Sequence, residues 1–231
     1  MKNISLIQNR FFKKILLFAI FGFAALNSGY KESPNEIDIH QLWLDCKLDK
    51  VLSYNIFNLA IRGSSGIINI KKKNFITIID YSKPSTEKRF FVIDLENKKL
   101  LYMCLVAHGK NSGDFFAKNF SNQLQSLKSS LGFYLTAETY TGIHGYALKL
   151  DGLEKGINSN AREREIVIHG AEYVSQKFID KYGRLGRSWG CPALPVEICK
   201  EIIDKISNGS CLFIYSQDKY YTENSNFIYR K

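Results

Sequence analysis

The sequence places one cysteine, Cys191, at a bend suited to a reactive thiol. It lies in GRLGRSWGCPALP (residues 183–195), between Gly190 and Pro192, where the backbone cannot continue a helix or a strand interior. A thiolate can attack an acyl carbonyl when a base takes the thiol proton and N–H donors hold the oxyanion. We therefore predict Cys191 as a nucleophile and Gly190 as the residue that shapes the turn and aims its N–H groups.

His169 is the predicted base for this thiol. It follows the apolar run at 166–168, so a strand is expected to end at its imidazole, and catalytic side chains often lie at strand ends. An imidazole can take the proton of a thiol, whose ordinary pKa is about 8.5. His144 is also followed by glycine and is either an alternative base or a substrate contact. His169 is favoured because it lies nearer to Cys191 and ends a cleaner strand.

Further residues around this pair are predicted to bind substrate or shape the site. Arg184 and Arg187 would add positive potential that favours the thiolate. Ser188 either orients the loop and donates a hydrogen bond or is a simple turn residue. Trp189 either walls a substrate groove or packs inward. Gly170 would let another chain approach closely, because it carries no side chain.

A metal hydrolase is the competing chemistry. His108, His144, His169 and Cys191 are all residue types that bind zinc. However, no HxxxH, HxH or HExxH spacing fixes two ligands on one element, and no CxxC occurs. We therefore expect neither a metal nor another cofactor.

The other four cysteines are not predicted to be reactive. Cys104, Cys199 and Cys211 lie in apolar runs, where cysteine acts as a small hydrophobic residue, whereas the sequence does not place Cys46. The total of five is odd, so an exported chain would keep at least one free or intermolecular thiol.

Residues 1–28 have the layout of a secretory signal, with a basic lead, an apolar stretch at 15–26 and a small, polar end. The apolar stretch is short for a membrane span, but an uncleaved N-terminal anchor is the open alternative. Removing these residues lowers the formal charge from +10 to +6. We expect an exported protein of the periplasm or cell envelope without a nucleic-acid partner, and in the alternative reading its N-terminus tethers it to the membrane.

The patterning of the remaining chain predicts a mainly β fold with helices. Residues 29–64 form a helical N-terminal segment, with apolar spacing over 34–62 and Gly63 ending the run. The sheet-rich domain at 65–231 follows. Its predicted strands cover 74–80, 89–95, 99–107, 131–140, 164–170 and 210–216, and its predicted helices cover 172–183 and 195–209.

Two segments together resemble the signature of the YkuD-type L,D-transpeptidases. IHGA (168–171) is followed by RSWGCPAL (187–194), and the positions that match are His169, Gly170, Ser188, Gly190 and Cys191. SSLGFYLT is similar to a family strand, and the stretch from YTGIHG to AEYVS resembles the murein L,D-transpeptidase catalytic domain branch. The resemblance covers roughly residues 65–216.

The resemblance implies a mixed β-sandwich-like sheet with helices and a cysteine acyltransferase. In that family the cysteine attacks a diaminopimelate carbonyl of a peptidoglycan tetrapeptide stem, D-alanine leaves, and an amine of another stem resolves the thioester into a 3→3 crosslink. Water as acceptor would make the protein an L,D-carboxypeptidase. A non-catalytic cell-wall-binding protein is a further alternative.

The chain departs from the family pattern at two points. Pro192 and Ala193 replace the usual hydrophobic–arginine pair after the cysteine, and we hypothesise that Arg184 or Arg187 substitutes for that arginine. His169 and Cys191 are 22 positions apart, which is longer than is common, because a predicted helix intervenes.

Overall fold

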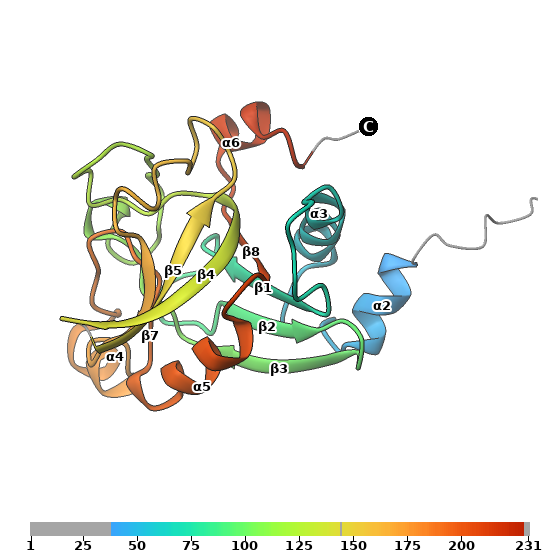
Figure 1. Cartoon of the computed structure of the whole chain (residues 1–231). Helices are drawn as coiled ribbons and strands as arrows, with labels where there is room; N and C mark the ends of the chain where they lie inside the picture. The colour runs from blue at the N-terminus through green and yellow to red at the C-terminus, as the bar shows by residue number, and fades with distance from the viewer. Residues whose placement is uncertain (1–37, 144, 229–231) are drawn as a thin grey trace, which may run out of the picture. The chain divides into compact units, whose positions relative to one another are not determined.

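One continuous eight-stranded sheet organises the described residues, 38–143 and 145–228, of the computed structural model (Figure 1). The strand order is β3-β2-β1-β8-β4-β5-β6-β7. The strands are β1 (Phe75–Asp80), β2 (Phe90–Asp94), β3 (Lys99–Cys104), β4 (Gly132–Gly142), β5 (Gly145–Gly152), β6 (Val167–Gly170), β7 (Ala193–Leu194) and β8 (Cys211–Tyr215). The prediction of a mainly β fold with helices is confirmed, whereas the predicted leader at 1–28 lies outside the described residues.

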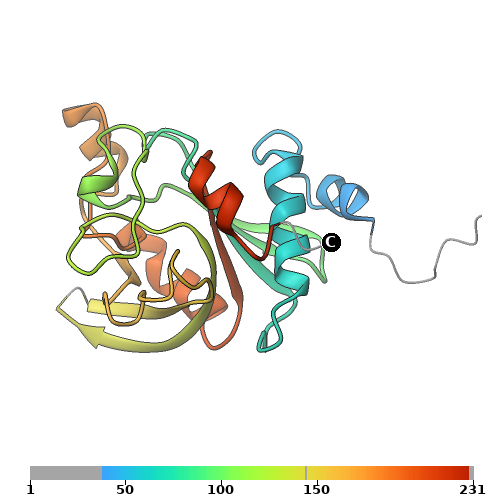
Figure 2. The ribbon, with the colours of Figure 1, turned by 90° about the horizontal axis from the view of Figure 1, so that it is seen from above.

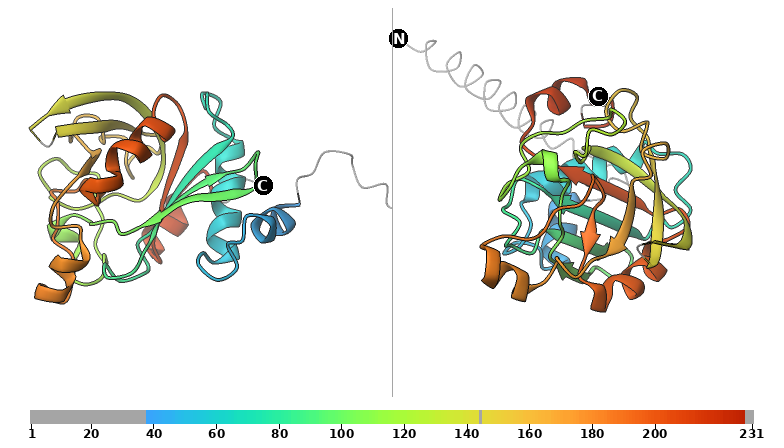
Figure 3. Two further views of the ribbon diagram at one scale, coloured as in Figure 1. Left: turned by 90° about the horizontal axis from the view of Figure 1, so that it is seen from below. Right: turned by 90° about the vertical axis from the view of Figure 1, so that its left-hand side faces the viewer.

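The sheet mixes parallel and antiparallel pairing. β8 lies between β1, to which it is parallel, and β4, to which it is antiparallel. β6 and β7 are also parallel, and the remaining neighbours are antiparallel. The β4–β5 hairpin projects from the end of the sheet away from the N-terminal helices (Figures 2 and 3). All six predicted strands occur, with shifted ends, but the sequence analysis missed β5 and β7.

From residue 38 on, the N-terminal helical segment contains two helices, α2 (Ile39–Asp45) and α3 (Tyr54–Ser65), and not one continuous helix. The chain turns between them, where Lys47 has a φ of 56° and the Trp43 indole donates to the Leu52 carbonyl at 2.8 Å. The prediction that Gly63 ends the helix is wrong. Gly63 lies inside α3, where the Phe133 ring occupies the space of a β-carbon, within 2.1 Å.

The N-terminal helices bury their apolar side chains in the same core as the sheet. α3 contacts β1 and β8, and Leu42, Phe57 and Ala60 belong to the cluster that also holds Phe133 and Phe213. The domain boundary at 64/65 stays a prediction. Within the described part of the chain, no helix has the length and apolar character needed to cross a bilayer.

Three further helices pack around the sheet or follow it: α4 (Gln176–Tyr182), α5 (Val196–Ile206) and α6 (Lys219–Asn224). Gly183 ends α4 with a φ of 70°, as predicted. α5 follows Pro195 and contacts β5 and β6. The sequence analysis missed α6, which begins where the Asp218 side chain accepts from the Tyr221 N–H at 2.7 Å.

All five cysteines are unpaired, and Cys46, Cys104, Cys199 and Cys211 are buried. Burial raises the pKa of Cys104 and of Cys199 to about 12. The prediction that three of these cysteines act as small hydrophobic residues is confirmed, and Cys46 joins them. Only Cys191 is partly exposed.

Candidate active site

Cys191 and His169 lie in neighbouring segments of the sheet, on or next to the strands β7 and β6. β6 pairs with β7 in parallel register, so that His169 lies opposite Ala193 and Gly170 opposite Leu194. Cys191 precedes Ala193 by two positions. The pairing thus brings together residues that are 22 positions apart in sequence.

The sulfur of Cys191 lies against the start of β6. The Val167 N–H donates to Sγ at 3.4 Å, and Sγ–H points to the Glu165 carbonyl at 3.6 Å. Burial raises the pKa of the Cys191 thiol above its ordinary value, and the Glu165 carboxylate raises it further. The Val167 N–H and the Arg164 guanidinium lower it. The thiol is therefore protonated at neutral pH, and a base is needed to remove its proton.

The bend that carries Cys191 is held by two serine hydroxyls. Ser188 Oγ donates to the Cys191 carbonyl at 2.6 Å and accepts from the Gly190 N–H at 3.1 Å. Ser129 Oγ donates to the Gly190 carbonyl at 3.0 Å and accepts from the Gly109 N–H at the same distance. Gly190 has a φ of 133°, which residues with a β-carbon rarely adopt. These contacts favour the loop-orienting reading of Ser188.

Ser188→Ala is expected to lower the free energy of unfolding by about 1–3 kcal/mol, because it leaves the Gly190 N–H and the Cys191 carbonyl without their partner. Denaturant unfolding of the full chain measures this change. Ser65→Ala is a matched control, since Ser65 Oγ donates only to the Arg62 carbonyl on the surface, and it should cost less than about 0.5 kcal/mol. Equal effects of the two substitutions would contradict the role of Ser188.

The AHGK segment around Gly109 supports the cysteine bend from the other side. The Ser188 N–H donates to the His108 carbonyl at 3.0 Å, and the Lys110 N–H donates to the Ser188 carbonyl at 2.8 Å. A β-carbon on Gly109 would lie 3.0 Å from the Gly190 Cα and 2.6 Å from the Leu127 carbonyl oxygen. Gly109 is therefore needed for close backbone packing against the bend.

His108 is a buried, neutral imidazole and not part of the cysteine pair. Nη2 of the fully buried Arg89 donates to its Nδ1 at 2.8 Å, so Nε2 carries the hydrogen and donates to the Gly113 carbonyl at 3.1 Å. The Arg89 guanidinium also stacks on Tyr81, 4.9 Å from the ring centroid. Burial, and secondly the Arg89 charge, lower the pKa of His108 to about 4.

This lowered pKa predicts an acid-sensitive contribution to stability. Because His108 binds a proton less readily in the folded state (pKa about 4) than in the unfolded state (about 6.5), the contribution is present above pH 6.5 and is lost as the pH falls through 4. The loss amounts to about 3 kcal/mol of unfolding free energy. It is measured as the difference between the wild type and His108→Asn in denaturant unfolding from pH 7 to 3.5. Parallel pH profiles of the two proteins would contradict it.

The His169 imidazole has the tautomer that a base requires. Its Nδ1 lies 3.0 Å from the Gly170 carbonyl oxygen, and because a carbonyl only accepts, Nδ1 carries the hydrogen. In the neutral ring the lone pair is then on Nε2. The side chain is buried at the end of β6.

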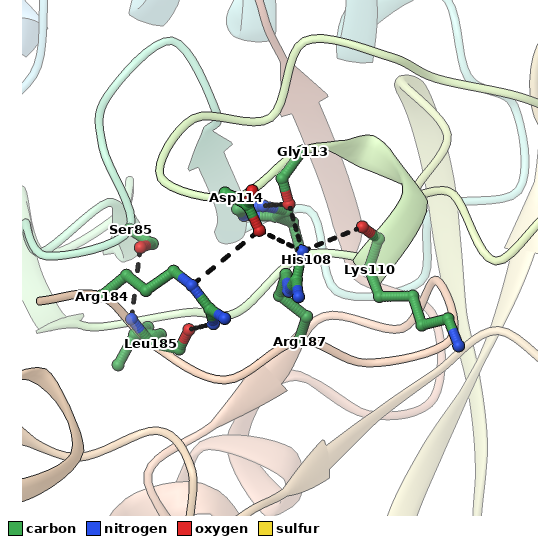
Figure 4. A network of polar contacts seen from close by, with 8 residues as sticks. All are labelled: Ser85, His108, Lys110, Gly113, Asp114, Arg184, Leu185 and Arg187. Carbon is green, nitrogen blue, oxygen red and sulfur yellow. Dashed lines mark hydrogen bonds and ion pairs between the residues drawn. The ribbon is translucent and has the colours of Figure 1, made fainter. Parts of the chain in front are cut away.

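The guanidinium groups of Arg184 and Arg187 point to the Asp114 carboxylate (Figure 4). Arg187 forms an ion pair with Asp114, and Arg184 Nε lies 3.9 Å from the same carboxylate. Arg184 also donates to the Leu185 carbonyl at 2.7 Å. The guanidinium that lowers the pKa of Cys191 belongs to Arg164, and neither Arg184 nor Arg187 lowers it. Stem binding by these two arginines stays a prediction.

The remaining predicted site residues are Trp189, Gly170 and His144. Trp189 is 74% exposed next to Cys191, so it does not pack inward. The chain that approaches Gly170 is the start of α5, since a β-carbon there would lie 3.3 Å from the Val196 Cα. His144 lies outside the described residues.

A groove of about 510 Å³ is lined by residues of β4, of β5 and of the segment that leads into β6. Glu165 and Val167 line it, and both also contact the Cys191 sulfur. Its other lining residues are apolar or cationic: Tyr140, Gly142, Ile143, Lys149, Leu150, Arg162 and Ile166. The groove has room for part of an extended peptide.

The sequence analysis missed three residues that contact or support the bend: Arg164, Ser129 and Gly109. The segment AHGK repeats the His–Gly pair of IHGA (168–171). This repeat is a signal for Gly109, because a glycine after histidine lets another backbone segment approach closely. Arg164 and Ser129 gave no local signal, since an arginine before a strand and a serine pair in a loop are common.

Comparisons with known proteins are consistent with this arrangement. The family described as L,D-transpeptidase catalytic domain matches residues 48–215. No curated protein sequence is significantly similar to the chain.

Three solved structures illustrate the similarity. An L,D-transpeptidase from Mycobacterium smegmatis is 13% identical, with 62% of this chain and 59% of that chain covered and a TM-score of 0.38. L,D-transpeptidase 1 from Mycobacterium tuberculosis is 13% identical, with 62% of each chain covered and a TM-score of 0.35. The helical cell shape determining protein Pgp2 from Campylobacter jejuni is 16% identical, with 71% and 55% covered and a TM-score of 0.45. The chain thus spans about three fifths of the first of these proteins.

Proposed function

The chain belongs to the L,D-transpeptidase catalytic domain family, and from this premise we propose that it is a cysteine acyltransferase acting on peptidoglycan tetrapeptide stems. Members of this family act on the peptide stems of the cell wall, outside the cytoplasm. In this proposal Cys191 is the nucleophile, His169 is the base, and the product is a 3→3 crosslink between stems. The protein works in the periplasm or cell envelope after export.

One observation carries the proposal: the Cys191 bend is fixed by Ser188 and Ser129 beside the strand that ends in His169. Packing alone does not require a partly exposed cysteine in a rigid turn. Four of the five cysteines are simply buried, which is the ordinary use of this residue.

The proposed reaction has two transfers. Nε2 of His169 takes the Sγ–H proton, and the thiolate attacks the carbonyl at the L-centre of diaminopimelate. The C–N bond to the terminal D-alanine breaks, the leaving amine takes the proton from the imidazolium, and a thioester remains. An amine of a second stem then attacks the thioester and gives a proton to Nε2 of His169. The C–S bond breaks, and the thiolate that leaves takes this proton back from the imidazolium. The backbone N–H of Cys191 stabilises the oxyanion in both steps, since the Gly190 N–H already donates to Ser188 Oγ.

Product analysis tests this function. The full chain is incubated with disaccharide tetrapeptides, and the products are separated by mass. Release of D-alanine together with crosslinked dimers supports transpeptidation, whereas tripeptides alone indicate the L,D-carboxypeptidase. No release of D-alanine, and no acyl adduct with a carbapenem, would leave a non-catalytic wall-binding protein.

A further inference from the structure

Arg164 is a half-buried guanidinium whose hydrogen bonds all go to uncharged oxygens. Nη1 donates to the Ser121 carbonyl at 2.6 Å and to Ser130 Oγ at 3.1 Å. Nη2 donates to the Lys128 carbonyl and to Ser126 Oγ at 3.3 Å. These bonds fix the guanidinium plane against the 121–130 segment.

Within the described part of the chain, no carboxylate forms an ion pair with Arg164. Arg162, only two positions away, makes the contrast clear: it lies 2.6 Å from Glu138 and 2.7 Å from Asp151. The charge of Arg162 is therefore matched on the surface, whereas that of Arg164 is not. A desolvated cation without a counter-ion is costly, and such an arrangement favours a negative charge nearby.

The cysteine bend also lies against this cation. A β-carbon on Gly190 would lie 3.3 Å from Nη2 of Arg164 and 2.8 Å from the Lys128 carbonyl oxygen that Nη2 contacts. The next residue after Arg164, Glu165, accepts from the Cys191 thiol through its carbonyl. The guanidinium is thus packed directly behind the bend that carries the sulfur.

We propose that Arg164 is a positioning residue for acyl transfer, whose fixed positive charge stabilises the thiolate of Cys191. The assignment rests on the proposed function for its catalytic meaning, although the charge effect on the thiol stands by itself. Ionisation of Cys191 moves one proton to His169 and leaves a negative sulfur in a desolvated place. Arg164 is the cation that compensates this charge in a chain that lacks the arginine usually found after the cysteine, since Ala193 stands there.

Other charged or titratable groups also face the sulfur, and they set the expected pH behaviour. Glu165, from the loop before β6, opposes Arg164 because its carboxylate repels a thiolate. Tyr81 and Tyr173 lie near enough to interact with the cysteine, but burial raises the pKa of each to about 12, so both are neutral. His169 lies on β6, opposite Ala193.

Alkylation of Cys191 by iodoacetamide as a function of pH tests the assignment, because only the thiolate reacts and the other four cysteines are buried. Peptide mass analysis assigns the adduct to Cys191. Arg164→Gln is expected to raise the midpoint by about one pH unit and to slow alkylation at pH 8 about tenfold, with an unchanged limiting rate at alkaline pH.

Three further variants separate charge from structure. Arg164→Lys keeps the charge and loses part of the hydrogen-bond fork, so its midpoint should stay close to that of the wild type. Glu165→Gln should lower the midpoint, because it removes the opposing charge. Arg162→Gln is the matched control and should leave the midpoint unchanged.

An unchanged midpoint in Arg164→Gln would overturn the proposal. If that variant does not fold, Arg164→Lys decides: a midpoint near that of the wild type supports the charge effect, and a raised midpoint refutes it. The outcome is independent of the proposed function, which fails when the wild type forms neither products nor acyl adducts, whatever the alkylation profile.

Discussion

Cys191→Ala should form no acyl adduct with a carbapenem or a tetrapeptide stem, while the wild type gains the mass of one acyl group. The thioester requires the sulfur, and the neighbouring Ser188 hydroxyl is committed to the Cys191 carbonyl at 2.6 Å. Loss of the nucleophile should lower the acylation rate on the order of 10⁴-fold or more. Intact mass measured over time after mixing follows the reaction.

Cys199→Ala is the matched control for this experiment. Cys199 is buried on α5, where burial raises its pKa to about 12, so it should not be acylated and its loss should leave the adduct intact. An adduct on Cys191→Ala would show that another residue is the nucleophile, and the proposed mechanism would have to be abandoned.

His169→Gln is expected to lower the acylation rate by about 10²–10⁴-fold, because it removes the proton acceptor from the end of β6. The loss should be largest near neutral pH, where burial keeps the Cys191 thiol protonated, and smaller at alkaline pH, where hydroxide can ionise the thiol. A pH profile of carbapenem acylation measures both features.

Two other histidines complete this test. His40 lies on α2, outside the candidate site, so the His40→Gln variant should be acylated at the wild-type rate. His144→Gln addresses the alternative base. If His169 is the base, the loss in His144→Gln should be the smaller of the two, and the reverse order would transfer the role to His144.

The sequence revealed those parts of the fold that depend on local patterns. Strand β1 is mostly apolar with all six residues buried, and α5 repeats isoleucine at helical spacing after Pro195. β5 and β7 were missed for different reasons. The alternation in β5 is interrupted by polar and glycine residues, and β7 has only two residues whose strand geometry comes from pairing with β6.

Other elements depend on contacts that no local pattern shows. α6 is polar by sequence, and it is tied to the sheet because buried Glu154 accepts from the Tyr221 and Ser225 hydroxyls. Gly63 was predicted to end a helix, but it is needed for the packing of the Phe133 ring. Neither partner is close in sequence.

The candidate site shows the same division. Cys191 and His169 stand out because a glycine–proline bend and a strand end are local features. Arg164 does not stand out, because its partners lie about 40 positions earlier, in the 121–130 segment, and 26 positions later, at Gly190. Arg184 and Arg187 were chosen for their nearness in sequence to Cys191, yet both meet Asp114.

The position of β8 has a consequence for the order in which the protein is assembled. This strand is the last of the eight in sequence, yet it joins β1 on one side to β4 on the other. A growing chain that stops before Cys211 has two groups of strands with no ladder between them, apart from the isolated bridges of Ala107 with Ala193 and of Gly109 with Ser188. The central sheet is therefore completed only when β8 has been added, after the other seven strands have been synthesised.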